Sequence, residues 1–383
     1  MKQLGNLGLG LTTGVLLLVG GCPFLQSAEK VASEPARPII SADPDLQAEI
    51  SEDIDALVAS TVVSDEPGVA VLVMADQKVL YAEGYGVSDI ETQTPITPET
   101  VFDLASVSKQ MTAIAILILS EQGDVQIDAP IVEYLPDFQD PNSDQPILLS
   151  DLLHHTSGLA DYTSDAWDGS DTDFATLDLE AHLTWLNQQA PVNRPGGVFE
   201  YNNSGYALLA LIVQRVSGQS FAQFMEAEIF APAGMSQTQV YQRLGQVIPN
   251  QATGYIVDDN GEVERSSFPS VIAGDGNVFS SLTDLAQYDT ALRQNALVSS
   301  ETLALAFAPG ELADGSLIED DGESYGMGWQ IASGYVHHSG GWLGTSTYYR
   351  YYQGPEVSII VLSNDENYDP VALGEDIAEL LFP

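Results

Sequence analysis

The chain has 383 residues, and 55 Asp and Glu residues against 11 Lys and Arg residues give it a formal net charge of −44. This charge argues against nucleic acid as a partner, because the chain and the phosphate backbone repel each other. Hydrophobic residues make up 44% of the chain, which is enough for a sizeable core. The composition suits a saline medium, where salt screens the repulsion, and it suits an ordinary acidic exported protein equally well.

The N-terminal segment 1–22 has the basic start, apolar middle and small-residue end of a secretory signal. It ends at Cys22, the only cysteine, where the sequence resembles the lipidation site of a bacterial lipoprotein. We predict export, cleavage and lipidation of Cys22. An uncleaved anchor is the alternative, but the apolar run is short and rich in glycine. Residues 23–44 contain four prolines and predict a tether, so the chain is expected to reach a membrane only through its lipid.

The first part of the folded chain predicts a helix followed by a hairpin and a buried helix. Apolar residues recur at helical spacing over 46–57, and strands at 69–74 and 79–85 flank a turn at 76–77. Residues 107–119 are apolar almost all round, and Gly123 follows them. This pattern predicts a helix that is buried on most faces.

The middle of the chain is predicted to be helical and the end to return to strands. We expect helices at 148–155, 179–189, 205–217 and 219–230, with a polar loop at 160–178. The expected later elements are strands at 252–257 and 262–267 around an Asn260-Gly261 turn, strands at 334–338, 345–352 and 357–362, and a helix at 369–380. The order predicts one α/β (α+β) domain over 45–383, in which a sheet part, about 45–130 and 250–383, carries a helical insertion, about 131–249.

Lys109 follows Ser106 by one helical turn at the start of the buried helix. A separation of three residues places both side chains on one helix face. Burial disfavours the charged form of an amine, so such a lysine is suited to accept the serine proton. The Ser-x-x-Lys pattern also recurs by chance in many proteins, so the pair alone does not define a catalytic site.

The stretch Phe102-Asp103-Leu104-Ala105-Ser106-Val107-Ser108-Lys109 resembles the active-site helix of the serine β-lactamase and penicillin-binding protein superfamily. Further along, Tyr201-Asn202-Asn203 is similar to the Tyr-x-Asn element of the class C β-lactamases and their esterase and peptidase relatives. The resemblance implies that Tyr201 relays protons to and from Ser106 and that Asn203 binds a substrate amide or orients Lys109.

A third element, His338-Ser339-Gly340-Gly341, precedes the strand at 345–352, where the family has the edge strand of its cleft. The resemblance implies that the N–H groups of Ser106 and Gly341 form the oxyanion hole and that His338, Ser339 and Gly340 bind substrate. It also implies a mainly antiparallel sheet flanked by helices, with a helical subdomain. His338 replaces the lysine of class C β-lactamases, which weakens the expected binding of a β-lactam carboxylate.

Three further stretches extend the resemblance over about 60–383: residues 152–159, 231–235 and 274–281. The last of these is expected to line the cleft. Metal binding by the two His-His pairs, at 154–155 and 337–338, is disfavoured, because adjacent residues of a strand point to opposite faces. The acidic stretches at 258–262 and 319–323 lack the full spacing of a calcium loop. We therefore expect no metal and no cofactor.

The sequence thus predicts an exported, monomeric serine hydrolase of the cell envelope that acts through an acyl-enzyme on Ser106. Its substrate is a small molecule or peptide: an ester, a D-amino-acid amide or peptide, or a β-lactam. The rival prediction is a lipid-anchored penicillin- or peptidoglycan-binding protein of the same fold that does not turn over. The presence of Ser106, Lys109 and Tyr201 together favours the enzyme.

Overall fold

The structure is a computed structural model, and it describes residues 44–141, 145–166, 176–258, 260–267 and 270–383. The predicted signal segment, Cys22 and the tether up to residue 43 lie outside these residues, so export and lipidation stay predictions. None of the helices in the described ranges is both long and apolar enough to span a membrane.

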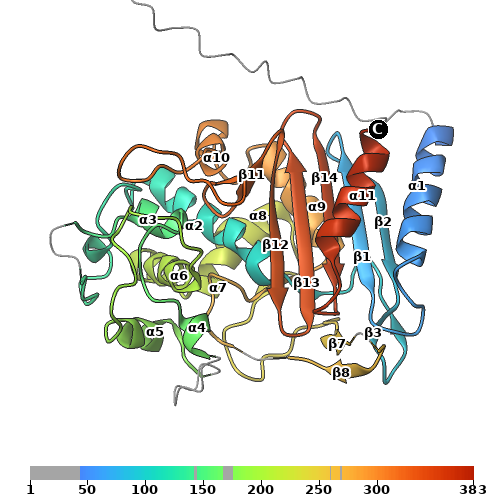
Figure 1. Cartoon of the computed structure of the whole chain (residues 1–383), viewed down its shortest axis with the longest axis horizontal. Coiled ribbons are helices and arrows are strands. Elements are labelled where there is room, and N and C mark those ends of the chain that lie inside the picture. Colours follow the sequence, from blue (N-terminus) through green and yellow to red (C-terminus); the bar gives the residue numbers. More distant parts are fainter. Residues whose placement is uncertain (1–43, 142–144, 167–175, 259, 268–269) are drawn as a thin grey trace, which may run out of the picture. The chain divides into compact units, whose positions relative to one another are not determined.

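A seven-stranded sheet forms the centre of the fold (Figure 1), and each of its strand pairs is antiparallel. Three of its inner strands are buried at every residue; two of them are mostly apolar and the third is rich in tyrosine. The spatial order is β10 (Ser324–Tyr325), β11 (Gln330–Ala332), β12 (Tyr335–Trp342), β13 (Thr345–Tyr352), β14 (Val357–Ser363), β1 (Val69–Ala75) and β2 (Lys78–Tyr85).

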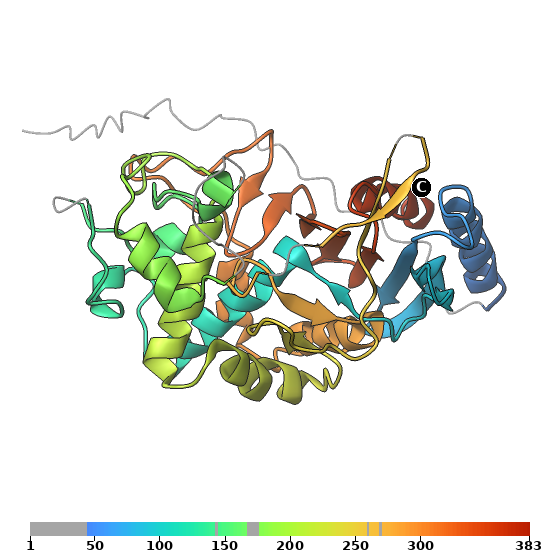
Figure 2. The same ribbon diagram turned by 90° about the horizontal axis from the view of Figure 1, so that it is seen from below.

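Alternate side chains of β1 enter two separate hydrophobic cores. Val69, Val71 and Val73 pack with apolar residues of α1 (Pro44–Ala59) and α11 (Pro370–Leu381). Ala70 and Leu72 face the other core, where α9 (Leu282–Arg293) packs against β1 and β2. The sheet is therefore a middle layer. Figure 2 shows α1 and α11, blue and dark red, on the side away from the green and yellow helices.

Helix α2 (Ser108–Gln122) lies at the centre of the second core. Every residue from Ser108 to Leu119 is buried, as the apolar pattern predicts. The helix ends at Gly123, which adopts a φ of 82° that favours glycine. Helix α6 (Asn203–Ser217) packs along α2. The first residues of these two helices carry part of the candidate site.

The other helical elements are short, and several begin at a capping side chain. Asp178, Ser220, Ser281 and Ser299 each accept a hydrogen bond from a backbone N–H of the first turn that follows. These short elements are η1 (Ala105–Val107), η2 (Ile131–Glu133), α3 (Leu149–Leu153), α4 (Tyr162–Ala166), α5 (Leu179–Leu186), α7 (Phe221–Met225), η3 (Glu226–Phe230), α8 (Ala231–Ala233) and α10 (Ser300–Ala306).

Three small sheets complete the described fold. β5 (Phe102–Asp103) and β6 (Gln239–Val240) both pair with β9 (Val278–Ser280), which ties the segment before Ser106 to the later chain. The other two sheets are the pairs β3 (Val87–Asp89) with β4 (Thr94–Pro95), and β7 (Tyr255–Val257) with β8 (Val263–Arg265). The predicted hairpin at 252–267 is thus shorter than expected and stands apart from the main sheet.

The structure differs from the prediction in three elements. The strand expected at 334–338 runs to Trp342, so the whole His-Ser-Gly-Gly motif lies within β12. The loop expected at 160–178 begins with helix α4, and residues 167–175 of it lie outside the described residues. The helix expected at 219–230 is interrupted by the π-helical turn η3. Pro232 follows this turn and has no N–H to continue the α-helical pattern.

Candidate active site

Ser106 lies in the turn η1, between the short strand β5 and helix α2. Ala105 adopts a φ of 46°, a left-handed conformation that is unusual for a residue with a side chain. The carboxylate oxygen Oδ1 of Asp103 accepts the Ala105 N–H at 2.9 Å. The hydroxyl of Thr347 in β13 donates to the Leu104 carbonyl at 2.8 Å. Hydrogen bonds from both sides therefore hold the strained turn that presents the serine.

Lys109 is fully buried in the first turn of α2. Its Nζ donates to three oxygens: Ser106 Oγ at 3.1 Å, Asn203 Oδ1 at 2.8 Å and the Asp275 carbonyl at 2.8 Å. An ammonium group has three N–H donors, so each donor has a partner. The neutral amine keeps a lone pair, and Ser106 Oγ lies within reach of it. The predicted pairing of Ser106 with Lys109 is thus a hydrogen bond in the structure.

Asn203, the first residue of α6, is held with its amide oxygen toward Lys109. Its Nδ2 donates to Asp161 Oδ2 and Thr163 Oγ1, both at 3.2 Å, and its backbone N–H donates to Asp161 Oδ2 at 2.6 Å. Because both partners of Nδ2 accept hydrogen bonds, Oδ1 is the atom left to accept from Lys109. These contacts favour one of the two roles implied for Asn203, which is the orientation of Lys109.

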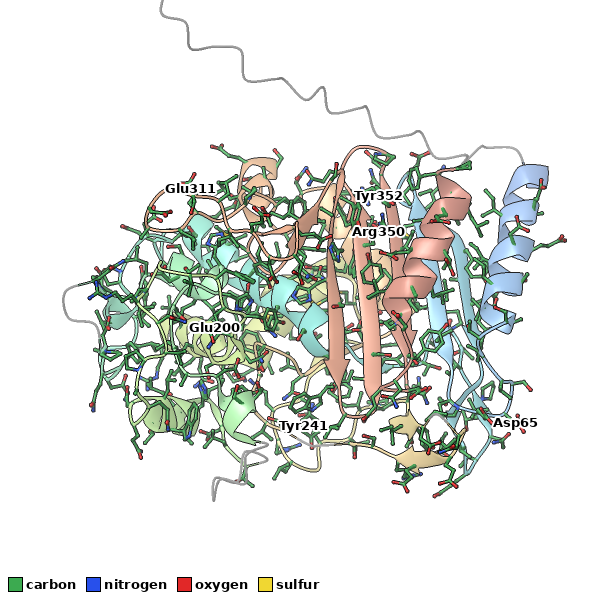
Figure 3. The ribbon with its side chains drawn as sticks, viewed as in Figure 1. Asp65, Glu200, Tyr241, Glu311, Arg350 and Tyr352 are labelled. Atoms are coloured by element: carbon green, nitrogen blue, oxygen red, sulfur yellow. The ribbon has the colours of Figure 1, made fainter. Side chains whose placement is uncertain are left out.

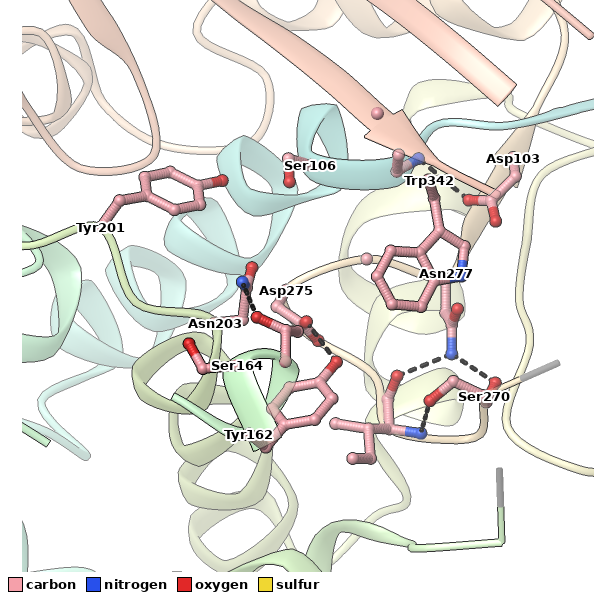
Figure 4. A pocket seen from close by; sticks show the side chains of 15 residues that line it. Asp103, Ser106, Tyr162, Ser164, Tyr201, Asn203, Ser270, Asp275, Asn277 and Trp342 are labelled. Carbon is pink, nitrogen blue, oxygen red and sulfur yellow. Dashed lines mark hydrogen bonds between the residues drawn. The ribbon is translucent and has the colours of Figure 1, made fainter. Parts of the chain in front are cut away.

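Tyr201 lies on the loop before α6, and its hydroxyl points toward Ser106 (Figure 4). Its ring stacks on that of His155 at 4.3 Å between centroids, and Lys109 Nζ lies 4.8 Å from the Tyr201 centroid. The tyrosine is 38% exposed, so one side of the ring faces solvent. The arrangement allows Tyr201 to exchange a proton with a group bound at Ser106.

His155 is a positioning residue that the sequence did not reveal. Its Nδ1 accepts the Asn202 N–H at 3.0 Å, and its ring also contacts Tyr206 and Tyr325. Burial lowers the pKa of His155 well below its ordinary value, and the Lys109 charge lowers it further. The ring is therefore neutral and forms an apolar support for Tyr201. Its position within residues 152–159, where the family resemblance extends, was the one signal available.

Gly340 and Gly341 of strand β12 lie beside the turn η1, which carries Ser106. A side chain at Gly340 would lie 2.5 Å from the Leu104 carbonyl oxygen and 3.1 Å from the Ser106 nitrogen, so glycine permits this close approach. A side chain at Gly341 would contact nothing within 4 Å. The edge of β12 thus lies beside the backbone N–H of Ser106, as an oxyanion hole made by Ser106 and Gly341 requires.

His338 and His337 point to opposite faces of β12. The His338 Nδ1 lies 2.6 Å from the Ser339 carbonyl and therefore carries the proton, while Nε2 accepts from the Tyr325 hydroxyl at 3.1 Å. Burial lowers the pKa of His338 to about 3, and the Lys109 charge acts in the same direction. His337 instead contacts Glu323 at 2.8 Å. His338 is thus a buried neutral residue.

A cavity of about 420 Å³ opens beside Ser106. Its wall includes four of the residues singled out from the sequence, which are Ser106, Tyr201, Asn203 and Gly341. The wall does not include His338, Ser339 or Gly340, which were expected to bind substrate. The stretch 274–281, expected to line the cleft, contributes residues 275–277 to the wall.

The wall also contains Asp103, Tyr162 and Trp342, for which the sequence analysis predicts no role. Tyr162 donates its hydroxyl to Asp275 Oδ2 at 2.6 Å (Figure 4). Burial raises the pKa of Tyr162 well above its ordinary value, so the hydroxyl keeps its proton. In the described residues, no group of three or more His, Cys, Asp or Glu side chains is arranged to hold a metal ion.

The antiparallel sheet between helices, and the grouping of Ser106, Lys109 and Tyr201 beside one cavity, define a protein of the serine β-lactamase-related class. The Beta-lactamase family model matches residues 54–382, and the chain belongs to this family. The family is one of serine hydrolases, and the resemblance inferred from the motifs is confirmed.

Two curated relatives show how far the likeness extends. A penicillin-binding protein of Bacillus subtilis (strain 168) is 32% identical over 308 residues, which are 75% of this chain and 66% of that protein. A D-aminopeptidase of Gluconobacter oxydans (strain 621H) is 27% identical over 329 residues, which are 82% of this chain and 59% of that protein. The chain thus spans about two thirds or less of the length of these two relatives.

Solved structures confirm the predicted fold. An octameric penicillin-binding protein homologue from Pyrococcus abyssi has a TM-score of 0.73 and 28% identity, over 87% of this chain and 77% of that chain. A penicillin binding protein from Bacillus halodurans has a TM-score of 0.72 and 26% identity, over 87% of this chain and 97% of that chain.

Proposed function

We propose that the protein is a serine hydrolase that transfers the acyl group of an ester, a D-amino-acid amide or a β-lactam to Ser106 and then to water. The observation that carries the proposal is the 3.1 Å contact between Lys109 Nζ and Ser106 Oγ beside a cavity of about 420 Å³. Burial of a lysine is unfavourable, and packing alone does not explain why its amine contacts a serine beside a cavity. Activation of a nucleophile accounts for it.

In the first step, Ser106 Oγ attacks the carbonyl carbon and its proton passes to a base, which is the amine form of Lys109 or the phenolate form of Tyr201. The N–H groups of Ser106 and Gly341 hold the oxygen that becomes negative. The tetrahedral species then collapses, the bond to the leaving group breaks, and the proton returns to that group through Tyr201. Water repeats the sequence on the Ser106 ester, which releases the acid and restores the serine.

Turnover of a chromogenic panel tests the proposal: a p-nitrophenyl ester, a D-amino-acid p-nitroanilide and a penicillin. Ser106→Ala is expected to lower kcat/KM on each accepted substrate by about 10³-fold or more, because Ser106 is the hydroxyl of the described wall that bonds to Lys109 Nζ. Tyr201→Phe removes only the hydroxyl and is expected to lower kcat by about 10²- to 10⁴-fold.

Ser60→Ala is the matched control, since Ser60 is exposed and, among the described residues, its hydroxyl donates to the Leu57 carbonyl. It is expected to leave kcat/KM unchanged. Binding of penicillin without turnover, equal in wild type and Ser106→Ala, would instead favour a binding protein of the same fold. Equal turnover by wild type and Ser106→Ala would contradict the mechanism.

A further inference from the structure

The charged side chains in the described wall of the cavity beside Ser106 are all acidic. Among its lining residues the ionisable side chains are the carboxylates of Asp103 and Asp275 and two tyrosines, with no Lys, Arg or His. A second cavity of about 240 Å³ shares Asp103 and Trp342 with the first, and its described lining also lacks a basic residue. The internal stretches outside the described residues contain no Lys, Arg or His in their sequence.

Lys109 and His338 lie just outside the wall, but neither offers a positive charge with a free donor to a ligand in the cavity. Lys109 uses its three donors on protein oxygens, and one of these is the nucleophile itself. His338, with a pKa lowered to about 3 by burial, is neutral near pH 7. A substrate carboxylate in this cavity would therefore lose its hydration and meet carboxylates, which is unfavourable.

One carboxylate oxygen of Asp275 is buried without a hydrogen-bond donor among the described residues. The residue is 7% exposed and lines the cavity, and its Oδ2 accepts from Tyr162. Its Oδ1 is buried, and no described residue donates a hydrogen bond to it. Asp275 therefore adds negative charge beside the cavity, although its buried oxygen does not face a bound ligand.

Asp103 offers an accessible acceptor where the two cavities meet. Its Oδ1 accepts the Ala105 N–H, and no described residue donates to its Oδ2. The side chain is partly exposed and lines both cavities, three residues before the nucleophile. Figure 4 shows both carboxylates among the side chains of the wall around Ser106.

We infer that the substrate carries an ammonium group near the bond that is cleaved, and that the carboxylate of Asp103 binds it. This inference rests on the proposed function, because it concerns the substrate of Ser106. An ammonium group supplies three donors and a positive charge, which matches the Oδ2 acceptor of Asp103, the further negative charge of Asp275 and the lack of a cation on the described wall. The preferred substrates are amides or esters with a free amine.

The test compares three D-alanine p-nitroanilides that differ only at the amine: free, N-acetylated and N-succinylated. They present an ammonium group, no charge and a carboxylate. For the wild-type chain, kcat/KM is expected to be highest for the free amine, about 10- to 100-fold lower for the acetyl compound, and lowest for the succinyl compound. Equal or reversed preference overturns the inference, and so does failure to cleave the free-amine compound.

Asp103→Asn keeps the acceptor for the Ala105 N–H and removes the charge. It is expected to lower kcat/KM for the free amine about 10- to 100-fold relative to kcat/KM for the acetyl compound, so that the preference collapses. Asp314→Asn, an exposed carboxylate outside the cavity wall, removes the same charge and is expected to keep the preference. An unchanged preference in Asp103→Asn overturns the assignment of this residue.

A neutral p-nitrophenyl ester separates the two proposals. One outcome is that Ser106→Ala abolishes hydrolysis of the ester, while kcat/KM of the wild type is equal for the three anilides. This result supports the proposed hydrolase and contradicts the ammonium site. If Ser106→Ala changes nothing on any substrate, the hydrolase itself falls.

Discussion

Asp103 connects the geometry of the nucleophile with the charge of the cavity. One oxygen fixes the Ala105 N–H and thereby the strained turn that carries Ser106. The same carboxyl group is withdrawn from water and lies near Asp275. Burial raises the pKa of Asp103 from an ordinary 3.8 to about 6, the Ala105 N–H opposes this, and Asp275 adds to it. The group therefore titrates close to neutral pH.

The pH dependence of kcat/KM follows from this shift. Asp103 is ionised above about pH 6 and binds an ammonium group, whereas below it the carboxyl group is neutral. The ratio of kcat/KM for the free-amine anilide to that for the acetyl anilide is expected to fall on acidification through pH 6. In Asp103→Asn this ratio is expected to be flat between pH 5 and 8, and a flat wild-type ratio would contradict the account.

The same shift gives the sign of the contribution of Asp103 to stability. Because the folded pKa is raised, the folded chain holds a proton between about pH 4 and pH 6 that the unfolded chain has released. The contribution of Asp103 therefore becomes less favourable as pH rises through this window. Other carboxylates titrate there as well, so the kinetic ratio is the cleaner readout.

At the scale of residues, the sequence predicted the pairs that are close along the chain. Ser106 and Lys109 share a helical turn, so their contact follows from spacing. Tyr201 and Asn203 were reached only through the family resemblance, because they are about a hundred residues away. His155, Asp275 and Tyr162 act through contacts between distant segments, and a single sequence gives no periodicity or spacing that would bring them together.

At the scale of elements, the site depends on how strand β12 meets the turn η1. The sequence predicted a strand that ends at 338, since two glycines follow, and glycine is unfavourable in isolated strands. The strand continues because Gly340 and Gly341 stay paired with β13, and glycine at 340 leaves room for the Leu104 carbonyl. Tertiary packing thus extends the element beyond what local propensity indicates.

The two glycines are expected to respond differently to a methyl group. Gly340→Ala is expected to displace the nucleophile turn, to lower the free energy of unfolding by about 1–3 kcal/mol and to reduce kcat strongly. Gly341→Ala adds a methyl group in open space, so the melting temperature is expected to stay unchanged while KM rises for bulky acyl groups. Urea unfolding and turnover of both variants test this, and similar behaviour of the two would contradict it.

At the scale of the whole molecule, the fold class and the long elements were predictable and the small ones were not. The long helix at 107–119 and the strands at 345–352 and 357–362 show strong patterns and lie where expected. The three-stranded sheet of β5, β9 and β6 has two or three residues in each strand. Such short strands are defined by their partners, and no pattern of that length identifies them.

The net charge of −44 is also a property of the whole molecule. Exposed carboxylates such as Asp65, Glu200 and Glu311 come from distant segments (Figure 3), while few cations are available to pair with them. Arg350 does not pair with these exposed carboxylates, because it is 9% exposed and its Cζ lies 3.6 Å from the Tyr335 ring centroid. The surface therefore repels itself at low ionic strength.

Salt is expected to stabilise the folded chain. Raising NaCl from 0.1 M to 1 M shortens the Debye length from about 10 Å to about 3 Å, which screens repulsion between surface carboxylates. The melting temperature measured by circular dichroism is expected to rise by several degrees, and most of the rise should precede 1 M. Sucrose, which does not screen charge, serves as the control. A melting temperature that does not change with NaCl would contradict the expectation.

The central claim is that Ser106 carries the acyl group, and intact-mass spectrometry of the acid-quenched protein tests it most directly. Wild type and Ser106→Ala are mixed with p-nitrophenyl acetate at neutral pH, quenched within seconds and digested to locate the adduct. The account predicts one added acetyl group in wild type, on the peptide that contains Ser106, and none at the corresponding peptide of Ser106→Ala. An adduct of equal yield in both proteins, or turnover without any adduct on that peptide, would contradict it.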